Sequence, residues 1–274
     1  MQRRRGGSAP VQDSGESRHR RRFATLAACA TSKAASDKPA SDKSAPIDRA
    51  RAQALVDAPD RTDRDRALDA GRKPADSLVF FQLSPGMRVA ELGAGGGYTT
   101  ELLARAVAPD GVVYAQNPDV FLKSFLKDVW PARLSRPAMK NVVRVDRDFD
   151  DPLPPEAKDL DRVLMNVIYH DVTYMQVDRD KMNQAIFAAL KPGGEFIVVD
   201  SSAKPGTGAS PAKELHRIDE QFVKDEVQKA GFKLQAEGDF LRNPEDARDW
   251  DSSPGAAGAR RGTSDRFALR FVKP

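Results

Sequence analysis

One stretch of the chain decides the fold: Val89-Ala90-Glu91-Leu92-Gly93-Ala94-Gly95-Gly96-Gly97-Tyr98. An apolar strand runs into a glycine-rich loop, and a helical pattern that includes Leu102 and Leu103 begins directly after it. Glycine lets the backbone adopt left-handed dihedral angles and approach a ligand without a Cβ in the way. The start of the following helix presents free N–H groups. The stretch therefore predicts a strand–loop–helix unit that holds part of an adenosine-containing cofactor at the carboxyl end of the first strand.

The spacing of the glycines separates two kinds of cofactor loop. A dinucleotide-binding loop has the pattern G-x-G-x-x-G, with Gly or Ala in the last place so that the helix packs closely on the strand. Counted from Gly93 and Gly95, that place holds Tyr98, which is too large. The pattern acidic-x-G-x-G-x-G fits instead, with Glu91, Gly93, Gly95 and Gly97. This pattern resembles motif I of the class I S-adenosylmethionine-dependent methyltransferases.

Further segments extend this resemblance over about residues 75–235. The predicted strand Val112–Gln116 ends at Asn117, where the family usually has an acid that bridges the two ribose hydroxyls. An amide can also accept from and donate to hydroxyls, but it lacks the charge. The segment Asn141–Pro154 resembles the third strand and its following loop, in which Asp148 matches the residue that contacts the adenine amino group. Asp146 and Asp150 remain alternatives for that contact.

The order of the predicted elements and the resemblance together imply the fold class. Alternating strands and helices indicate a mostly parallel sheet that is covered on both faces. The resemblance makes this an α/β fold with a seven-stranded, mostly parallel, Rossmann-like sheet of the methyltransferase type. Phe232–Ala236 and Phe267–Val272 are expected to form an antiparallel C-terminal pair. We also expect a helix over Val120–Val129 and a turn at Lys191-Pro192-Gly193-Gly194.

The expected cofactor is S-adenosyl-L-methionine. The resemblance implies that its binding residues lie in the glycine loop, at the ends of the second and fourth strands, and after the third strand. These residues are Glu91, Gly93, Ala94, Gly95, Gly97, Tyr98, Asn117, Asp148 and Asn166.

Candidate catalytic residues follow the fourth predicted strand, Val163–Ile168. Methyl transfer is an in-line displacement, so the main task of the protein is to align the nucleophile with the methyl group. A general base helps only where the nucleophile must lose a proton. Tyr169, His170 and Asp171 lie where ligands bind in open α/β sheets, past the carboxyl end of a strand. His170 is suited to act as a base near neutral pH, oriented by Asp171 or another acid; the alternative is a hydrogen-bonded histidine in a turn, with Asp171 capping a helix.

Other polar groups carry weaker signals. His216 and Asp219 are spaced by one helical turn, but two ligands without a third favour a solvated helix face over a metal site, and no metal is expected. Asp200, after the fifth predicted strand, either touches the substrate or simply ends the strand. The long connection Asp251–Asp265 contains Arg260 and Arg261, which either receive an anionic substrate or solvate the loop.

The first 45 residues are expected to be a disordered leader and tether, with the methyltransferase domain over residues 46–274. Within the leader, a basic cluster precedes Leu26-Ala27-Ala28-Cys29, which resembles a bacterial lipoprotein signal peptide. Only six residues separate Arg22 from Cys29, fewer than the usual apolar region of such a signal, so an ordinary disordered extension is the alternative. The protein would be membrane-anchored on the periplasmic side if Cys29 is lipidated, and cytoplasmic otherwise.

Whole segments also resemble a bacterial group of predicted methyltransferases whose substrate is unassigned. These segments are Ala70–Pro74, Tyr169–Asp171, His216–Asp219 and Gly262–Arg266. This resemblance implies a fold and a cofactor but no substrate.

Charge and composition limit the partners. The chain of 274 residues has a net charge of +4, but residues 1–45 contain ten basic and four acidic residues. The remaining 34 basic and 36 acidic residues give a net charge of −2, so the body has no overall attraction for nucleic acid phosphates. The single cysteine, Cys29, cannot form an intrachain disulfide. We therefore expect a small-molecule methyl acceptor, no nucleic acid, and membrane contact only through a lipid at Cys29.

Two other functions remain open on the sequence. Asn117 and the leader favour a non-catalytic, membrane-tethered binding or sensory module on the same fold, because S-adenosylmethionine is made in the cytoplasm. An NAD-dependent oxidoreductase is disfavoured by Tyr98.

Overall fold

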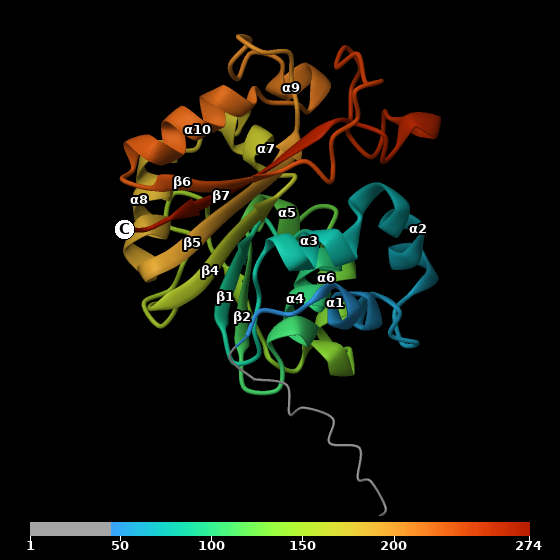
Figure 1. Ribbon diagram of the computed structural model, residues 1–274, viewed down its shortest axis with the longest axis vertical. Helices are drawn as coiled ribbons and strands as arrows, with labels where there is room; N and C mark the ends of the chain where they lie inside the picture. The colour runs from blue at the N-terminus through green and yellow to red at the C-terminus, as the bar shows by residue number, and fades with distance from the viewer. Residues whose placement is uncertain (1–44) are drawn as a thin grey trace, which may run out of the picture. The chain divides into compact units, whose positions relative to one another are not determined.

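The computed structural model describes residues 45–274, so the predicted leader and Cys29 lie outside the described residues (Figure 1). Its strands form one sheet in the order β3-β2-β1-β4-β5-β7-β6. The five strands from β3 to β5 are parallel, and β7 runs antiparallel to both β5 and β6. This confirms the predicted fold class, including the antiparallel C-terminal pair. The strands are β1 (Arg88–Leu92), β2 (Val112–Asn117), β3 (Val142–Asp146), β4 (Leu160–Asn166), β5 (Leu190–Ser201), β6 (Lys233–Gly238) and β7 (Arg266–Val272).

Helices connect the strands and precede the first of them. None of the helices between residues 45 and 274 combines the length and apolarity needed to cross a bilayer. The α-helices are α1 (Arg49–Val56), α2 (Asp63–Arg72), α3 (Pro74–Phe80), α4 (Tyr98–Val107), α5 (Asp119–Leu122), α6 (Val129–Leu134), α7 (Tyr169–Tyr174), α8 (Arg179–Ala189), α9 (Ala212–Leu215) and α10 (Glu220–Lys229), and the 3-10 turns are η1 (Pro137–Met139) and η2 (Gly258–Arg260).

The sheet separates two apolar clusters, because alternate residues of a strand point to opposite faces. Ala90 of β1 packs with residues of α8 and α10, whereas its neighbour Val89 packs with residues of α1, α3 and α4. Figure 1 shows these two groups of helices on opposite sides of the sheet. Burial on both faces explains why the central strands read as continuous apolar runs.

Two local predictions need correction. The expected helix Val120–Val129 is wrong, because α5 stops at Leu122 and α6 starts only at Val129. The Ser124 hydroxyl donates to the carbonyl of Val120, a side-chain bond that competes with helix continuation.

The expected turn at Lys191–Gly194 is instead an irregularity within β5, whose register to β4 shifts between Leu160 and Arg162. Gly193 permits the irregularity because its φ is +75°.

The segment between β6 and β7, residues 239–265, is held over the carboxyl edge of the sheet by a buried ion pair. Arg217 is completely buried and lies 2.8 Å from Asp246. Its guanidinium also donates to the carbonyls of Ser202 and Trp250 and lies 4.6 Å from the centre of the Trp250 ring. This pairing fixes the segment against the residues that follow β5.

Candidate functional site

The glycine loop joins β1 to α4 through residues that need a left-handed backbone. The φ angles are +66° at Gly93, +55° at Gly95 and +80° at Gly97. Gly97 is the N-cap of α4. A side chain at these positions would strain the backbone, which accounts for the glycine spacing in the sequence.

The three glycines differ in what a side chain would meet. A Cβ on Gly93 would lie 2.5 Å from the Ile168 side chain, and one on Gly97 would lie 2.7 Å from Arg133 and 2.8 Å from Trp130. A Cβ on Gly95 would meet only the Gly93 carbonyl oxygen, at 4.0 Å. Gly93 and Gly97 are therefore required for packing, whereas Gly95 borders open space into which a ligand can approach the backbone.

The end of β2 holds the loop in this shape. Gly93 N–H donates to the Gln116 side chain at 2.9 Å, and Gly95 N–H donates to Asn117 Oδ1 at 2.8 Å. The Asn117 amide group donates back to the Gly95 carbonyl at 3.3 Å. An aspartate could accept the first bond of this pair but could not donate the second, which gives a structural reason for asparagine at this position. Sequence analysis did not predict that Gln116 supports the loop. A glutamine in a strand shows no sequence pattern that identifies a hydrogen bond to a neighbouring loop.

Glu91 is buried beneath the loop and accepts a hydrogen bond from the Thr100 hydroxyl at 2.5 Å. Burial raises the pKa of its carboxyl to about 7, although the Thr100 hydrogen bond and the Arg72 charge act in the opposite direction. Glu91 therefore titrates near neutral pH and gains a clear preference for the ionised form once a cation binds beside it.

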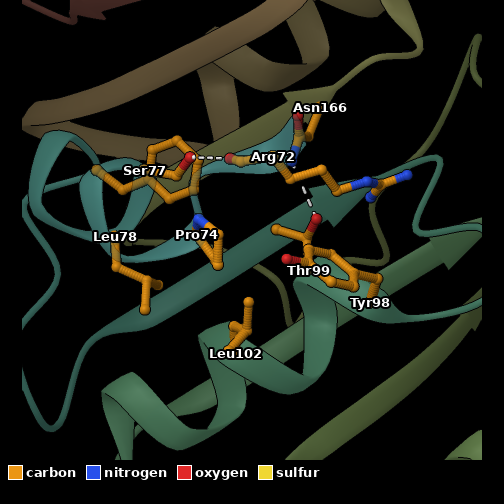
Figure 2. Close-up of a pocket in the computed structure, with 9 residues that line it drawn as sticks. Arg72, Pro74, Ser77, Leu78, Tyr98, Thr99, Leu102 and Asn166 are labelled. Carbon is orange, nitrogen blue, oxygen red and sulfur yellow. Dashed lines mark hydrogen bonds between the residues drawn. The ribbon is translucent and has the colours of Figure 1, made fainter. Parts of the chain in front are cut away.

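A narrow pocket opens beside the first turn of α4 (Figure 2). Arg72 extends along it, and its guanidinium lies 4.6 Å from the centre of the Tyr98 ring. Desolvation lowers the pKa of Arg72, and among residues 45–274 its guanidinium forms no ion pair with a carboxylate. The pocket therefore contains a cation that lacks an anionic partner. Its lining consists of Arg72, Pro74, Ser77, Leu78, Phe81, Tyr98, Thr99, Leu102 and Asn166.

The other predicted cofactor residues lie along the same edge. Ala94 is buried in the loop, and Asn166, at the end of β4, donates to the Thr99 hydroxyl at 3.0 Å. Asp148 is exposed in the loop after β3, with no side-chain hydrogen bond to the described part of the chain. Its two alternatives are engaged, since Asp146 pairs with Arg144 at 2.8 Å and Asp150 accepts from the backbone of Asp178 at 2.7 Å.

The Tyr98 hydroxyl forms a hydrogen bond within the chain. It donates to Asp69 of α2 at 2.6 Å, and Arg61 contacts the same carboxylate at 2.8 Å. Arg133 of α6 similarly donates to the Gly96 carbonyl at 3.0 Å and pairs with Asp65 of α2 at 2.6 Å. These ionic contacts join the amino-terminal helices to the glycine loop, and sequence analysis missed them because the partners are far apart in the chain.

The predicted catalytic histidine lies at the start of α7. His170 is buried, and Asp200 at the end of β5 accepts from its backbone N–H at 2.9 Å and lies 2.7 Å from its Nδ1. Asp171 lies on the other side, with Oδ1 at 3.3 Å from His170 Nε2. The acid that orients the ring through Nδ1 is therefore Asp200, for which the sequence offered two interpretations, and not Asp171.

Burial disfavours the charged form of His170, but the charge of Asp200 and the hydrogen bonds of Asp171 and Asp200 outweigh it and raise the pKa to about 10. In this arrangement His170 is an imidazolium at neutral pH, which positions an anionic group but does not remove a proton. Tyr169 is not part of this cluster. Its side chain is completely buried, and its hydroxyl contacts Glu226 of α10 and Asn183 of α8.

Arg266 at the start of β7 connects the two halves of the site electrostatically. Desolvation, together with the charges of Arg72 and Arg217, lowers its pKa to about 10, while Asp200 acts in the opposite direction. Its Nε is buried and has no hydrogen-bond partner within residues 45–274. The cofactor side and the His170 side thus meet at a second cation that is poorly compensated.

The comparison with family models covers one part of this site. The family model for protein-L-isoaspartate(D-aspartate) O-methyltransferase matches residues 42–127. The match contains the glycine loop and Asn117 but neither His170 nor Asp200. It therefore bears on the cofactor half of the site and leaves the other half open.

The curated relatives and the solved structure that resemble this chain are named as methyltransferases. The chain is 29% identical over 149 residues to the protein-L-isoaspartate O-methyltransferase of Methanopyrus kandleri, which covers 54% of this chain and 59% of that protein. It is also 29% identical over 140 residues to the acetylserotonin O-methyltransferase of Mus musculus, which covers 50% of this chain and 34% of that protein. This chain thus spans less than two thirds of either relative. A methyltransferase structure from Aquifex aeolicus, described as S-adenosylmethionine-dependent, shares the fold with a TM-score of 0.53 at 17% identity, over 83% of this chain and 100% of that one.

The buried carboxyl of Glu91 generates a prediction about stability and pH. Because its pKa is raised from 4.5 to about 7, the folded chain binds this proton more tightly than the unfolded chain. The burial penalty on the ionised form therefore lowers stability above pH 7, by up to about 3 kcal/mol, and is absent below pH 4.5. Glu91→Gln, which is neutral at every pH, should be more stable than the parent in urea unfolding at pH 8, and this advantage should disappear at pH 4.

Glu245 is exposed, so Glu245→Gln is the matched control for the loss of one carboxylate without a change in burial. If Glu91→Gln is equally or less stable than the parent at pH 8, Glu91 does not carry a burial penalty there, and the assigned shift is wrong.

Proposed function

We propose that this member of the class I S-adenosylmethionine-dependent methyltransferases transfers a methyl group to a small anionic acceptor at the ends of β4 and β5. The observation that carries the proposal is the open space at Gly95 in the glycine loop. The buried carboxyl of Glu91, which precedes the loop and interacts with the charge of Arg72, supports it. Bound S-adenosylmethionine supplies a methyl group activated by a positively charged sulfur. Everything else in the reaction is alignment by the chain's own residues.

The residues fit the amino acid end of the cofactor. Its ammonium group calls for an anion, and Glu91 provides a carboxyl that ionises near neutral pH. Its carboxylate calls for a cation, and Arg72 provides one without a carboxylate partner among residues 45–274. We assign these two residues to the amino acid end, and the Gly95 backbone and the Asp148 carboxylate to the adenosine end.

The acceptor is proposed to be anionic because a buried cation lies on its side of the site. The buried Nε of Arg266 lacks a hydrogen-bond partner among residues 45–274, and a buried charge is stabilised when an opposite charge binds. An acceptor that enters as an anion, such as a carboxylate, needs no general base, and this agrees with the raised pKa of His170.

The acceptor is proposed to be small because two segments meet over the site. A Cβ on Gly71, in α2, would lie 2.6 Å from the Cα of Gly262, in the segment before β7. Arg266 donates to the Gly71 carbonyl at 2.9 Å, and Lys73 donates to the Phe240 carbonyl at 2.7 Å. These contacts between the amino-terminal helices and residues 239–265 favour a ligand that fits beneath them over a folded protein surface.

The two other functions are not favoured. An NAD-dependent oxidoreductase of the dinucleotide-binding type has six parallel strands in the order 3-2-1-4-5-6, whereas here β7 is antiparallel and lies between β5 and β6. A non-catalytic module was suggested partly by Asn117. Its two bonds to Gly95 give that residue a structural role, so it is no sign of a lost activity.

The proposed function is tested by calorimetric binding of S-adenosylmethionine, S-adenosylhomocysteine and NAD to the full chain. We expect micromolar binding of the first two and none of NAD. Gly95→Leu should abolish binding, because its side chain would occupy the open space beside the loop. Gly86→Leu, also at a positive φ with no atoms nearby but outside the loop, is the matched control for backbone strain.

The acceptor is tested by mass spectrometry with the methyl donor present. A panel of small carboxylic acids and an isoaspartyl peptide are offered side by side, and we expect methylation within the panel only. Methylation of the peptide alone would contradict a small acceptor while leaving the cofactor assignment intact. Failure to bind S-adenosylmethionine at all would contradict the function itself.

The assignment of Arg72 predicts a selective loss of affinity. Arg72→Met should weaken binding of S-adenosylhomocysteine by about 10- to 100-fold, since a charge-assisted contact contributes roughly 1.5–3 kcal/mol. 5′-Methylthioadenosine lacks the amino acid end, so its affinity should be nearly unchanged in calorimetry. Equal losses for both ligands would place Arg72 elsewhere in the site.

A further inference from the structure

The end of α9 contributes a second histidine to the acceptor side of the site. His170, Asp171 and His216 each offer a ligand atom, and these atoms all lie within 4.8 Å of one another. The rings of the two histidines are 5.5 Å apart and nearly perpendicular. The cluster joins α7, which follows β4, to the end of α9, which follows β5.

Both histidine rings are flanked by a carboxylate on the same nitrogen. Asp200 lies 2.7 Å from Nδ1 of His170, and Asp251 lies 3.1 Å from Nδ1 of His216. The Asp200 contact is of the kind that holds metal-binding histidines, because the carboxylate fixes the tautomer and leaves Nε2 as the ligand. At His216 the nearby carboxylate contributes charge, since Nδ1 forms no hydrogen bond within residues 45–274. Asp171 Oδ1 is already 3.3 Å from Nε2 of His170. A metal ion at this point would replace the proton that the His170 ring carries on Nε2.

The backbone at His216 is held in an unfavourable conformation that fixes the position of its ring. His216 has φ and ψ of +49°, in the left-handed region, and ends α9. Ser252 stabilises this turn by donating its hydroxyl to the His216 carbonyl at 2.6 Å and its N–H to the Leu215 carbonyl at 2.9 Å. Such conformations persist where the surrounding structure imposes them, and they are concentrated at functional sites.

We propose that His170, Asp171 and His216 bind a divalent transition-metal ion of the zinc class. Two imidazoles and one carboxylate suit Zn²⁺ and its neighbours, whereas Mg²⁺ and Ca²⁺ prefer oxygen ligands alone. A three-ligand site leaves one position open, as in zinc sites that bind a substrate. Asp171, Asp200 and Asp251 place three carboxylates around the two rings, and a dication balances their charge better than a single protonated histidine does.

This proposal revises the expectation of a solvated helix face at His216 and Asp219. The two residues do not share a helix, because His216 ends α9 and Asp219 is the N-cap of α10. Asp219 is buried and accepts from the backbone of Gln221 and Gly206. The ligands that accompany His216 come from α7 instead, and their distance along the chain concealed them from sequence analysis.

The test is metal binding to the full chain after removal of metals with a chelator. Calorimetry should show that one Zn²⁺ ion binds per chain. Co²⁺ should give the visible absorption band that is typical of a cobalt site with a low coordination number. His216→Gln and His170→Gln should each lower the Zn²⁺ affinity at least 100-fold. Asp200→Asn, which removes the negative charge beside His170 Nδ1, should lower it by about 10- to 100-fold.

The third histidine of the chain provides the matched control. His19→Gln should leave Zn²⁺ binding unchanged. The proposal is overturned if the unaltered chain binds neither Zn²⁺ nor Co²⁺, a result that does not depend on any variant folding. It is also overturned if His216→Gln retains full affinity or if His19→Gln loses it. None of these outcomes depends on binding of S-adenosylmethionine, so failure here and failure of the proposed function are separate results.

Discussion

Asn117 pairs with both backbone groups of Gly95, and the geometry of the glycine loop depends on this contact. The loop must cross from β1 to α4 with three glycines in left-handed conformations. Such a crossing leaves backbone groups without the partners that a helix or strand supplies, and buried backbone groups need partners. Gln116 and Asn117 provide them from the adjacent parallel strand. The side chain that departs from the family's usual acid is therefore a structural support for the loop.

Charged side chains on both sides of this loop form the remainder of the site. On the cofactor side, the carboxyl of Glu91 and the guanidinium of Arg72, which pairs with no carboxylate among residues 45–274, are both desolvated. On the acceptor side, Asp200 holds His170, and Arg266 lies between the two halves. Opposite charges in a poorly hydrated site interact strongly, so the cofactor side is suited to a donor whose amino acid end carries both an ammonium and a carboxylate group. Gly71, the neighbour of Arg72, packs against Gly262 of the segment before β7.

Much of this could be predicted from local sequence, for physical reasons. The spacing of the glycines at 93, 95 and 97 reflects backbone conformation, which is a local property. The alternation of apolar strands and helices predicts a mostly parallel sheet. What could not be predicted depends on contacts between distant segments. Asp200 reaches His170 across 30 residues, and His216 meets Asp171 only because α9 packs on α7. The prediction of a turn at Lys191–Gly194 was wrong, because β5 pairs with β4 on both sides of this segment and continues through it as a register shift. The leader before residue 45, with Cys29, remains a prediction.

The central claim is that the Gly93–Gly97 loop binds S-adenosylmethionine with its amino acid end between Glu91 and Arg72. The most direct measurement is a crystal structure of the full chain with S-adenosylhomocysteine. The account predicts that the ligand lies against the Gly95 backbone, with its ammonium group at Glu91 and its carboxylate at Arg72. A ligand bound away from the loop, or bound with its adenine between Glu91 and Arg72, would contradict it.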